Sequence, residues 1–366
     1  MKFINKYLRN LAPYKVASHK VWEVSDEKRK SILKLDWNES TIPPSPKVKD
    51  RLKKLVENEN VYFLYPSTHN NEILQRLSMY TKLPLDNIQY FASSDSLQEY
   101  LVRMYITVGD PILILGPTYD NFRLTSQAQG AVVHYFNYNS DFTLNEEGFI
   151  KTIENINPSL VYICNPNNPS GNIISKTFLK NIIHKFTDVI FLIDEAYYEF
   201  SGETMAEEVV IFPNLFVSRT FSKAFALANF RAGYLISDFT NIQQISKIRN
   251  SKNFTSFAQE AVIGVLSDID YMQAYVDEVI HTREWFSDEL SKISNIKKVY
   301  KSKANFILVE FDDFDSKMIA LNYLSENNVF VRNLVHSEIL INSLRITIGT
   351  RSQMERVFAL IKEANE

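Results

Sequence analysis

One lysine, Lys223, has sequence neighbours that could make its amine reactive toward a carbonyl group. It follows an apolar run, and the hydroxyl residues Thr220 and Ser222 stand on its amino-terminal side. An amine attacks a carbonyl only in its neutral form, which burial or nearby positive charge makes accessible by lowering the pKa. Arg219 and Arg231 supply such charge, and the two hydroxyls could help to seat an anion. The alternative is a surface lysine whose stem covers apolar side chains.

Two other apolar runs end in polar residues. Asn168 follows residues 160–163, whereas Asp194 and then Tyr197 follow residues 189–193. An acid at the end of an apolar strand is poorly solvated and calls for a cation, such as a protonated ring nitrogen. A helix cap is the alternative for Asp194, and a plain turn is the alternative for Asn168. Asn168 and Tyr197 could otherwise donate hydrogen bonds to a phenolic oxygen.

An anion site and a stacking ring are predicted upstream. Ser94 and Asp95 open a helix, where free N–H groups and the helix dipole attract anions. Tyr119 follows the apolar residues 111–115 and could stack on an aromatic ring. The alternatives are helix capping without a ligand and ordinary core packing of the tyrosine. Together with the lysine, the acid, the amide and the phenol, these features match pyridoxal 5′-phosphate.

Composition excludes several other classes of protein. The chain has 366 residues, a net charge of −3 and 45% apolar residues. It therefore lacks the net positive charge that would attract nucleic acid or an anionic membrane. It has nine glycines and no glycine-rich phosphate loop, and its six histidines lack metal-ligand spacing. No apolar run approaches the ~20 residues of a membrane span. With a single cysteine, we expect a cytoplasmic protein without disulfides or metal.

Apolar runs and helical periods alternate along most of the chain. This alternation is typical of a mostly parallel sheet flanked by helices. Helices are predicted over 46–57, 69–81, 97–106, 119–128, 175–185 and 240–249. Strands are predicted over 111–115, 131–136, 160–163, 189–193, 214–218 and 232–236.

A second pattern follows a long helical stretch, 256–293. It predicts strands near 297–310, 328–332 and 344–348 with helices over 315–327 and 351–363. We therefore expect a smaller α+β domain. The predicted division is an amino-terminal arm over 1–35, a large cofactor-binding domain over 36–275, and a small carboxyl-terminal domain over 276–366 that the arm joins.

The chain resembles the fold-type-I pyridoxal-phosphate-dependent aminotransferases of class I/II, in particular the histidinol-phosphate aminotransferase group. The resemblance runs nearly end to end, through residues 13–14, 38–39, 65–66, 94–95, 117–119, 165–171, 194–197, 219–223, 231–234, 302–306, 331–332 and 344–350. It implies an α/β fold with a large, mostly parallel sheet and a smaller α+β domain. It also implies transamination between glutamate and a phosphorylated keto or amino substrate.

Roles at the cofactor are implied by the same resemblance. Lys223 would bond to the cofactor aldehyde and move the proton, Asp194 would pair with the ring nitrogen, and Tyr119 would stack on the ring. Asn168 and Tyr197 would bind the phenolic oxygen. The cofactor phosphate would lie among Ser94, Asp95, Thr220, Ser222 and Arg231, joined by Tyr65 of a second subunit, which implies a homodimer with shared active sites.

Roles at the substrate follow in the same way. Arg345 would clamp a carboxylate through paired hydrogen bonds. Arg332 and Tyr14 match positions that bind the substrate phosphate in that group, and Asn38 joins the substrate-binding set. Read without the family, Arg332 is a surface arginine and Tyr14 a packed arm residue.

Departures from the family pattern concern the substrate. Ala226 and Asn229 replace glycines after the lysine, Ser40 and Thr41 replace a proline, and residues 91–96 lack the expected glycine and glutamate. Histidinol phosphate and a smaller phosphorylated ketone are both candidate substrates. Decarboxylation of a phosphorylated amino acid, of the threonine-phosphate or serine-phosphate type, is the alternative reaction. A non-catalytic cofactor-binding dimer is a third reading.

Overall fold

The apolar runs of the sequence form the centre of a seven-stranded sheet in the computed structural model, which describes residues 4–9, 11–12, 20–335 and 338–365. The strand order is β2-β8-β7-β6-β5-β3-β4. Strands β3 to β7 run parallel, whereas β8 is antiparallel to both of its neighbours. The strands are β2 (Ile88–Phe91), β3 (Pro111–Gly116), β4 (Val132–Asn137), β5 (Leu160–Cys164), β6 (Ile190–Asp194), β7 (Leu215–Thr220) and β8 (Gly233–Ser237).

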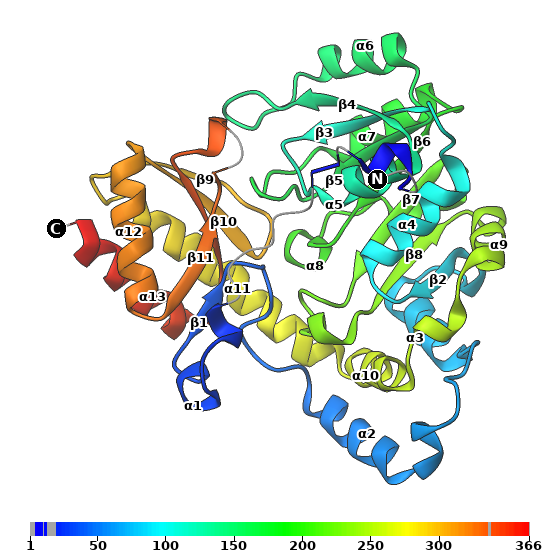
Figure 1. Cartoon of the computed structure of the whole chain (residues 1–366), viewed down its shortest axis with the longest axis horizontal. Helices are drawn as coiled ribbons and strands as arrows, with labels where there is room; N and C mark the ends of the chain where they lie inside the picture. The colour runs from blue at the N-terminus through cyan, green and yellow to red at the C-terminus, as the bar shows by residue number, and fades with distance from the viewer. Residues whose placement is uncertain (1–3, 10, 13–19, 336–337, 366) are drawn as a thin grey trace.

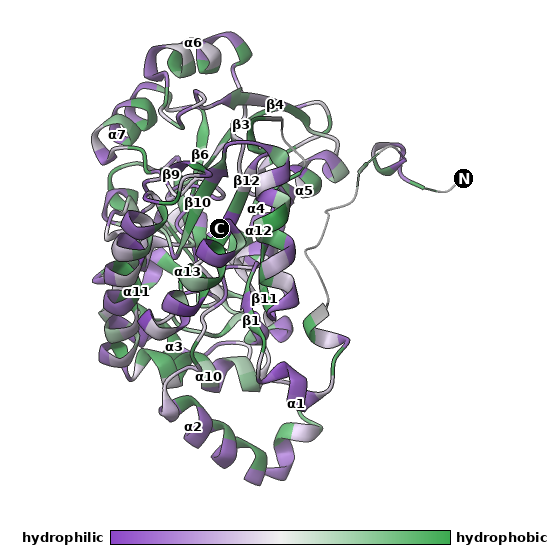
Figure 2. Cartoon of the chain, turned by 90° about the vertical axis from the view of Figure 1, so that its left-hand side faces the viewer, coloured by the Kyte–Doolittle hydropathy of each residue, from purple (hydrophilic) through white to green (hydrophobic). Residues whose placement is uncertain are grey.

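Strands β5, β7 and β8 are buried at every residue, as expected where helices cover both faces of a sheet. Figure 2 shows β6 and β10 as apolar, whereas the outer helices carry mixed polar and apolar residues. The helices of this part are α2 (Pro46–Glu57), α3 (Asn71–Thr81), α4 (Ser94–Tyr105), α5 (Asn121–Gln129), α6 (Glu146–Ile156), α7 (Lys176–Lys185), α8 (Tyr198–Ser201), α9 (Phe239–Ile248) and α10 (Ser256–Leu266).

A second sheet of five strands has the order β1-β11-β12-β10-β9. Figure 1 shows its strands at the left beside α12 and α13, with the long helix α11 running from this sheet toward α10. Its strands are β1 (Leu33–Leu35), β9 (Ile296–Tyr300), β10 (Phe306–Phe311), β11 (Val329–Asn333) and β12 (Ser343–Thr347). The remaining helices are α1 (Asp26–Arg29), α11 (Ile269–Leu290), α12 (Phe314–Glu326) and α13 (Arg351–Asn365).

Most predicted elements match the structure within a few residues, and the predicted fold class is confirmed. The single long helix over 256–293 is wrong, because α10 ends at Leu266 and α11 begins at Ile269. Strand β1 falls inside the predicted arm and pairs in parallel with β11 of the smaller sheet. Three residues are too few for alternation to signal a strand. Strand β2 and helix α6 were also missed.

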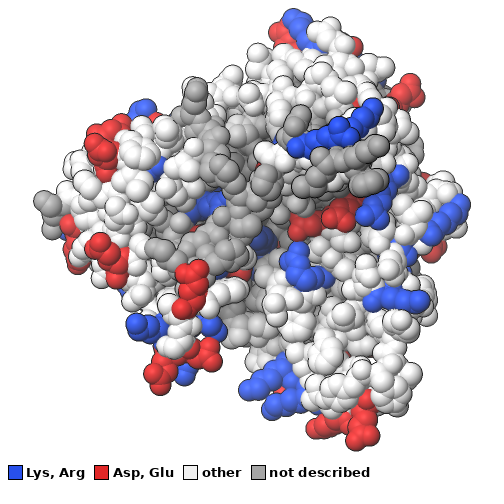
Figure 3. Space-filling model, in the orientation of Figure 1, with Lys and Arg blue, Asp and Glu red and all other residues white. Residues whose placement is uncertain are grey.

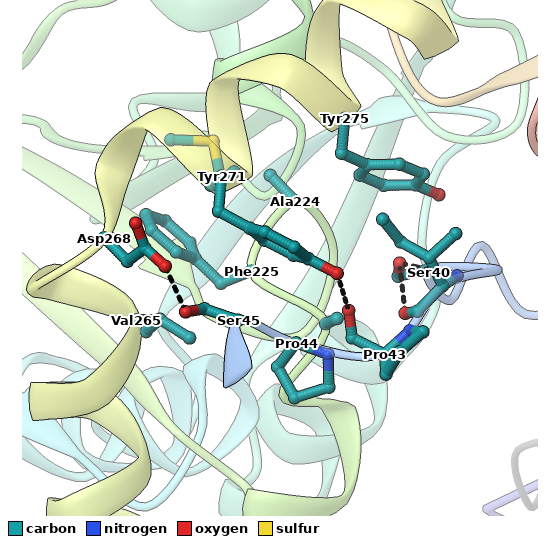
Figure 4. Close-up of a pocket in the computed structure, with 13 residues that line it drawn as sticks. Ser40, Pro43, Pro44, Ser45, Ala224, Phe225, Val265, Asp268, Tyr271 and Tyr275 are labelled. Atoms are coloured by element: carbon teal, nitrogen blue, oxygen red, sulfur yellow. Dashed lines mark hydrogen bonds between the residues drawn. The ribbon is translucent and has the colours of Figure 1, made fainter. Parts of the chain in front are cut away.

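The corner between α10 and α11 holds the loop that precedes α2 (Figure 4). The phenol of Tyr271 donates a hydrogen bond to the carbonyl oxygen of Pro43 at 3.1 Å. The hydroxyl of Ser45 bonds to the carboxylate of Asp268. Residues 224–226, which follow Lys223, line the same small cavity. The lysine loop is therefore packed against two segments distant from it in sequence.

Charged side chains of both signs are interspersed on the face in Figure 3, without a large patch of either sign. Of the helices in the described residues, none is long and apolar enough to cross a membrane.

Replacing Ala226 with glycine should stabilise the protein. Ala226 has a φ of +58°, in the left-handed region that glycine adopts without steric cost. We expect Ala226→Gly to raise the free energy of unfolding by about 0.5–1 kcal/mol. Urea denaturation measures this change. The matched control is Ala224→Gly, outside the left-handed region, which should destabilise; stabilisation by both changes would contradict the argument.

Candidate active site

A cleft of about 1450 Å³ opens at the carboxyl ends of the parallel strands and is lined by residues from both sheets. Ligands of open α/β sheets bind at this edge, and the volume exceeds the ~300–1000 Å³ typical of a single small-molecule pocket. The cleft therefore has room for a cofactor together with a substrate. The candidate residues that line it are Asn38, Ser94, Asp95, Tyr119, Asn168, Asp194, Tyr197, Thr220, Ser222, Lys223, Arg231, Arg332 and Arg345.

Lys223 reaches the cleft from the loop that follows β7. Its ammonium donates a hydrogen bond to the carbonyl oxygen of Trp37 at 2.9 Å. Burial is the main cause that lowers its pKa to about 8; the positive charge of Arg345 lowers the pKa further, and the negative charge of Glu39 opposes both. The neutral amine that carbonyl chemistry requires is therefore accessible near neutral pH.

Asp194 ends β6 and is buried at the floor of the cleft. One of its carboxylate oxygens accepts hydrogen bonds from the Gln98 amide and the Tyr162 phenol, each at 2.9 Å. Burial raises the pKa of this carboxyl, while the hydrogen bonds oppose the rise. Within the described part of the chain no lysine or arginine forms an ion pair with it. A protonated pyridine nitrogen would supply the missing positive charge, so the site fits pyridoxal phosphate.

Asn168 and Tyr197 lie on the same wall of the cleft, and each bonds to a residue that sequence analysis assigned to substrate. The oxygen of the Asn168 amide accepts a hydrogen bond from Arg345 at 2.6 Å, so the amide NH₂ is oriented away from that arginine. The Tyr197 phenol accepts one from the Asn38 amide at 3.0 Å. Burial raises the pKa of Tyr197, so its phenol stays protonated. Both side chains can therefore donate hydrogen bonds into the cleft.

The predicted phosphate seat lies where α4 begins beside β7 and β8. The Thr220 hydroxyl donates to Ser222 at 3.0 Å, which orders the turn before Lys223. A Cβ atom added to Gly233 would lie 2.6 Å from the backbone nitrogen of Ser94, so the glycine keeps this backbone accessible. Free N–H groups at a helix start suit a phosphate.

A charged pair borders this seat. The guanidinium of Arg231 bonds to the carboxylate of Asp95 at 3.1 Å. The same carboxylate accepts hydrogen bonds from the Tyr119 phenol at 3.3 Å and the Asn121 amide at 3.2 Å. Asp95 therefore orients both the arginine and the tyrosine that sequence analysis assigned to the cofactor.

Two arginines face the cleft from the smaller sheet. Arg332 on β11 and Arg345 on β12 are directly opposite each other in the antiparallel register, and both line the cleft. Like charges directly opposite each other in a sheet repel, and an anionic group bound beside them would offset this repulsion. The two guanidinium groups therefore make this part of the cleft a candidate site for an anionic group.

Two predicted residues are not part of this arrangement. Tyr65 is 79% exposed in the single chain and does not line the cleft. The ammonium of Lys252 lies 4.9 Å from its ring centroid. Tyr14 lies outside the described residues.

Sequence analysis missed several residues of the site. Tyr162 carries a hydroxyl in a buried strand, two positions before the strand ends, and Gln98 lies one turn into α4; both contact Asp194. These signals were present in the sequence but become meaningful only once the strands are adjacent. The Trp37 carbonyl, which binds Lys223, carries no sequence signal at all.

Comparison with known proteins places the chain in the family described as aminotransferase class I and II, whose model matches residues 30–361. It is similar to a dihydroxyacetone phosphate transaminase of Campylobacter jejuni, with 38% identity over 362 residues covering 98% of this chain and 96% of the relative. It is also similar to a histidinol-phosphate aminotransferase of Ruminiclostridium cellulolyticum, with 32% identity over 323 residues covering 88% and 89% of the two chains.

The fold resembles that of a solved histidinol-phosphate aminotransferase from Sinorhizobium meliloti in complex with pyridoxal 5′-phosphate. The TM-score is 0.88 at 23% identity, covering 100% of this chain and 98% of that one. The chain is thus a pyridoxal-phosphate-dependent aminotransferase with the histidinol-phosphate aminotransferase fold. The sequence predictions of family, enzyme class and cofactor are confirmed.

Covalent attachment of the cofactor should depend on pH with a midpoint near 8. The amine of Lys223 is protonated below its pKa of about 8 and neutral above it. The attachment rate to cofactor-free protein should therefore rise about tenfold per pH unit below 8 and level off above it. Borohydride trapping followed by mass spectrometry at a series of pH values measures the rate.

Lys223→Ala should abolish this trapping, whereas Lys151→Ala, which removes an exposed lysine outside the cleft, should leave the pH profile unchanged. A midpoint near 10.5, the ordinary value for lysine, would contradict the proposed effect of burial.

Proposed function

We propose that this aminotransferase moves an amino group between glutamate and a small phosphorylated ketone. The observation that carries the proposal is the pair Arg332 and Arg345, which lie opposite each other at the cleft that holds Lys223. Arg332 binds the phosphate of the ketone, and Arg345 binds the α-carboxylate of glutamate. Because the two arginines are adjacent, one site can take donor and acceptor in turn, as a ping-pong transaminase requires.

At the cofactor, pyridoxal phosphate supplies an electron sink for the carbon that carries the amino group. Lys223 would take the proton from that carbon and return it, because its lowered pKa of about 8 leaves a share of the amine neutral near physiological pH. The buried Asp194 carboxylate keeps the ring nitrogen protonated, which maintains the sink. Asn168 and Tyr197 would donate hydrogen bonds to the phenolic oxygen, and Tyr119 would stack on the ring.

Binding residues complete this assignment. The phosphate of the cofactor would lie among Ser94, Asp95, Thr220, Ser222 and Arg231, all of which line the cleft. Asn38 is assigned to substrate binding and is held in place by hydrogen bonds with Tyr197 and Thr347.

The smaller ketone is favoured over histidinol phosphate by the comparisons. The Campylobacter jejuni relative is named for dihydroxyacetone phosphate and has the higher identity over more of the chain. A smaller substrate also agrees with the departures from the family pattern at residues 40–41 and 91–96. The decarboxylase alternative has less support, because both sequence relatives reported above are transaminases by name.

A homodimer with shared active sites is also part of the proposal. Residues Tyr62, Phe63, Leu64 and Tyr65 are four consecutive large apolar or aromatic side chains, and they are 59–79% exposed in the single chain. A run of this kind on a soluble protein marks a protein–protein contact. Tyr65 would then reach the cofactor phosphate of the partner subunit.

Arg332→Gln should weaken the reaction with the phosphorylated ketone more than the reaction with glutamate. The change removes the proposed phosphate contact, so KM for dihydroxyacetone phosphate should rise about 10- to 100-fold, the cost of one charge-assisted hydrogen-bonding group. Single-turnover amination of the ketone and formation of 2-oxoglutarate from glutamate, followed separately, measure the two half-reactions. The glutamate half-reaction should be affected less.

The matched control is Arg356→Gln, which removes an exposed arginine of the same lobe outside the cleft. Equal effects of Arg332→Gln and Arg356→Gln would contradict the assignment of the phosphate. Failure of the unmodified enzyme to form 2-oxoglutarate from glutamate with any phosphorylated ketone, or release of carbon dioxide from phosphothreonine, would overturn the proposed reaction.

Hybrid dimers test the shared site. Lys223→Ala and Tyr65→Ala subunits should each be weakly active alone, because each dimer then has two defective sites. After subunit exchange, about half of the dimers are hybrids with one intact site, so activity should recover to roughly a quarter of normal. Steady-state transamination before and after exchange measures the recovery. No recovery, with hybrids verified by mass spectrometry, would show that Tyr65 does not complete a partner's site.

A further inference from the structure

Three charged residues on the wall of the cleft have no part in the functions assigned above. The ammonium of Lys34 contacts the carboxylate of Asp36 at 2.8 Å and is hydrogen-bonded to the carboxylate of Glu39. It also lies 3.9 Å from the ring centroid of Trp37. All three charged side chains line the cleft, and that of Lys34 is only 13% exposed. The ammonium of Lys34 is thus held between two carboxylates.

The position of this cluster connects it to the reaction centre. The Asp36 carbonyl accepts a hydrogen bond from Arg345 at 2.6 Å, and the next carbonyl, that of Trp37, accepts the bond from Lys223. Glu39 follows two residues later in the same segment. Consecutive residues that bind the substrate arginine and the catalytic lysine bring Glu39 to the same part of the cleft.

Electrostatics agree with this placement. Among charged groups, Glu39 has the largest effect on the pKa of Lys223, which it raises, and Lys34 has a smaller effect that lowers it. The Lys34–Glu39 pair therefore lies within electrostatic reach of the amine that carries out the chemistry.

We propose that Glu39, positioned by Lys34, accepts a hydrogen bond from the arm of the substrate that does not carry the phosphate. The inference rests on the proposed function and specifies its substrate class. The keto carbon of such a substrate has two arms, and the arginine pair accounts for the phosphate-bearing one. The second arm lies beside Glu39 and carries a neutral donor, either a hydroxyl or an azole N–H.

The chemistry of the cluster selects a neutral donor. An ionised carboxylate accepts hydrogen bonds at about four lone-pair positions, of which Lys34 occupies one. The negative charge of Glu39 disfavours an anionic arm, whereas an apolar arm would leave the lone pairs that Lys34 does not use without a donor. Sites built to bond a substrate hydroxyl reject the analogue that lacks it far more strongly than apolar pockets reject size variants.

Three ketones test the proposal with glutamate as donor. They are dihydroxyacetone phosphate, its analogue with a methyl group in place of the hydroxymethyl arm, and imidazole acetol phosphate. The quantity measured is the ratio of kcat/KM for each donor-bearing ketone to that for the methyl analogue. In the unmodified enzyme this ratio should be large for one of the two ketones. A large ratio for dihydroxyacetone phosphate identifies a hydroxyl as the group that bonds to Glu39, and a large ratio for imidazole acetol phosphate identifies an azole N–H.

Glu39→Ala should lower that ratio about 10- to 100-fold, the loss of one hydrogen bond to a charged group. Lys34→Met should lower it less, because the acceptor remains but is no longer held. The matched control is Glu147→Gln, which disrupts an exposed carboxylate–lysine pair with Lys151 outside the cleft and should leave the ratio unchanged.

An unchanged ratio in Glu39→Ala would overturn the proposal, whether the variant loses activity on all ketones equally or on none. An equal loss on all ketones, with a shifted pH profile, would mean that Glu39 acts only through its charge on Lys223. The proposed function fails by a different result, namely that the unmodified enzyme aminates no phosphorylated ketone.

Discussion

A carboxylate buried without a cation is the constraint on which this active site depends. Asp194 ends a strand in the middle of the sheet, and the hydrogen-bond donors that reach it from the described residues are neutral. These bonds and one from the Ala196 N–H offset part of the cost of burial, yet the pKa of the carboxyl remains raised. A positively charged ring nitrogen removes this penalty. The same contact between Asp194 and the ring nitrogen would therefore both bind the cofactor and activate it as an electron sink.

The second requirement is that the two sheets meet around that site. Residues 36–39 join them, because they follow β1 of the smaller sheet and contact residues of the larger one. The Trp37 carbonyl binds Lys223, and the Asn38 side chain binds Tyr197. From the opposite direction, Arg345 on the smaller sheet bonds to Asn168 on the larger. Substrate-facing and cofactor-facing groups are thus held by a few hydrogen bonds across the cleft.

Prediction from the sequence succeeded where a residue's role is local. Apolar strands buried on both faces are short continuous runs, so β3, β5, β6 and β7 were predicted within two residues. Polar residues at the ends of those runs identified Asn168, Asp194 and Lys223 as candidates. It failed where a role depends on a partner distant in the chain. Strand β1 has only three residues and exists because β11 pairs with it, and the break between α10 and α11 occurs where Asp268 contacts Ser45.

The sequence by itself determined the order of chemical groups along the chain. That order indicated the family, the cofactor and the edge of the sheet at which the cofactor would bind. Only the tertiary structure decided which groups face each other. The opposition of Arg332 and Arg345 and the pKa of Lys223 arise from strand register and burial. Both depend on residues that are distant in the chain, such as Trp37 and Lys223, so no local pattern in the sequence encodes them.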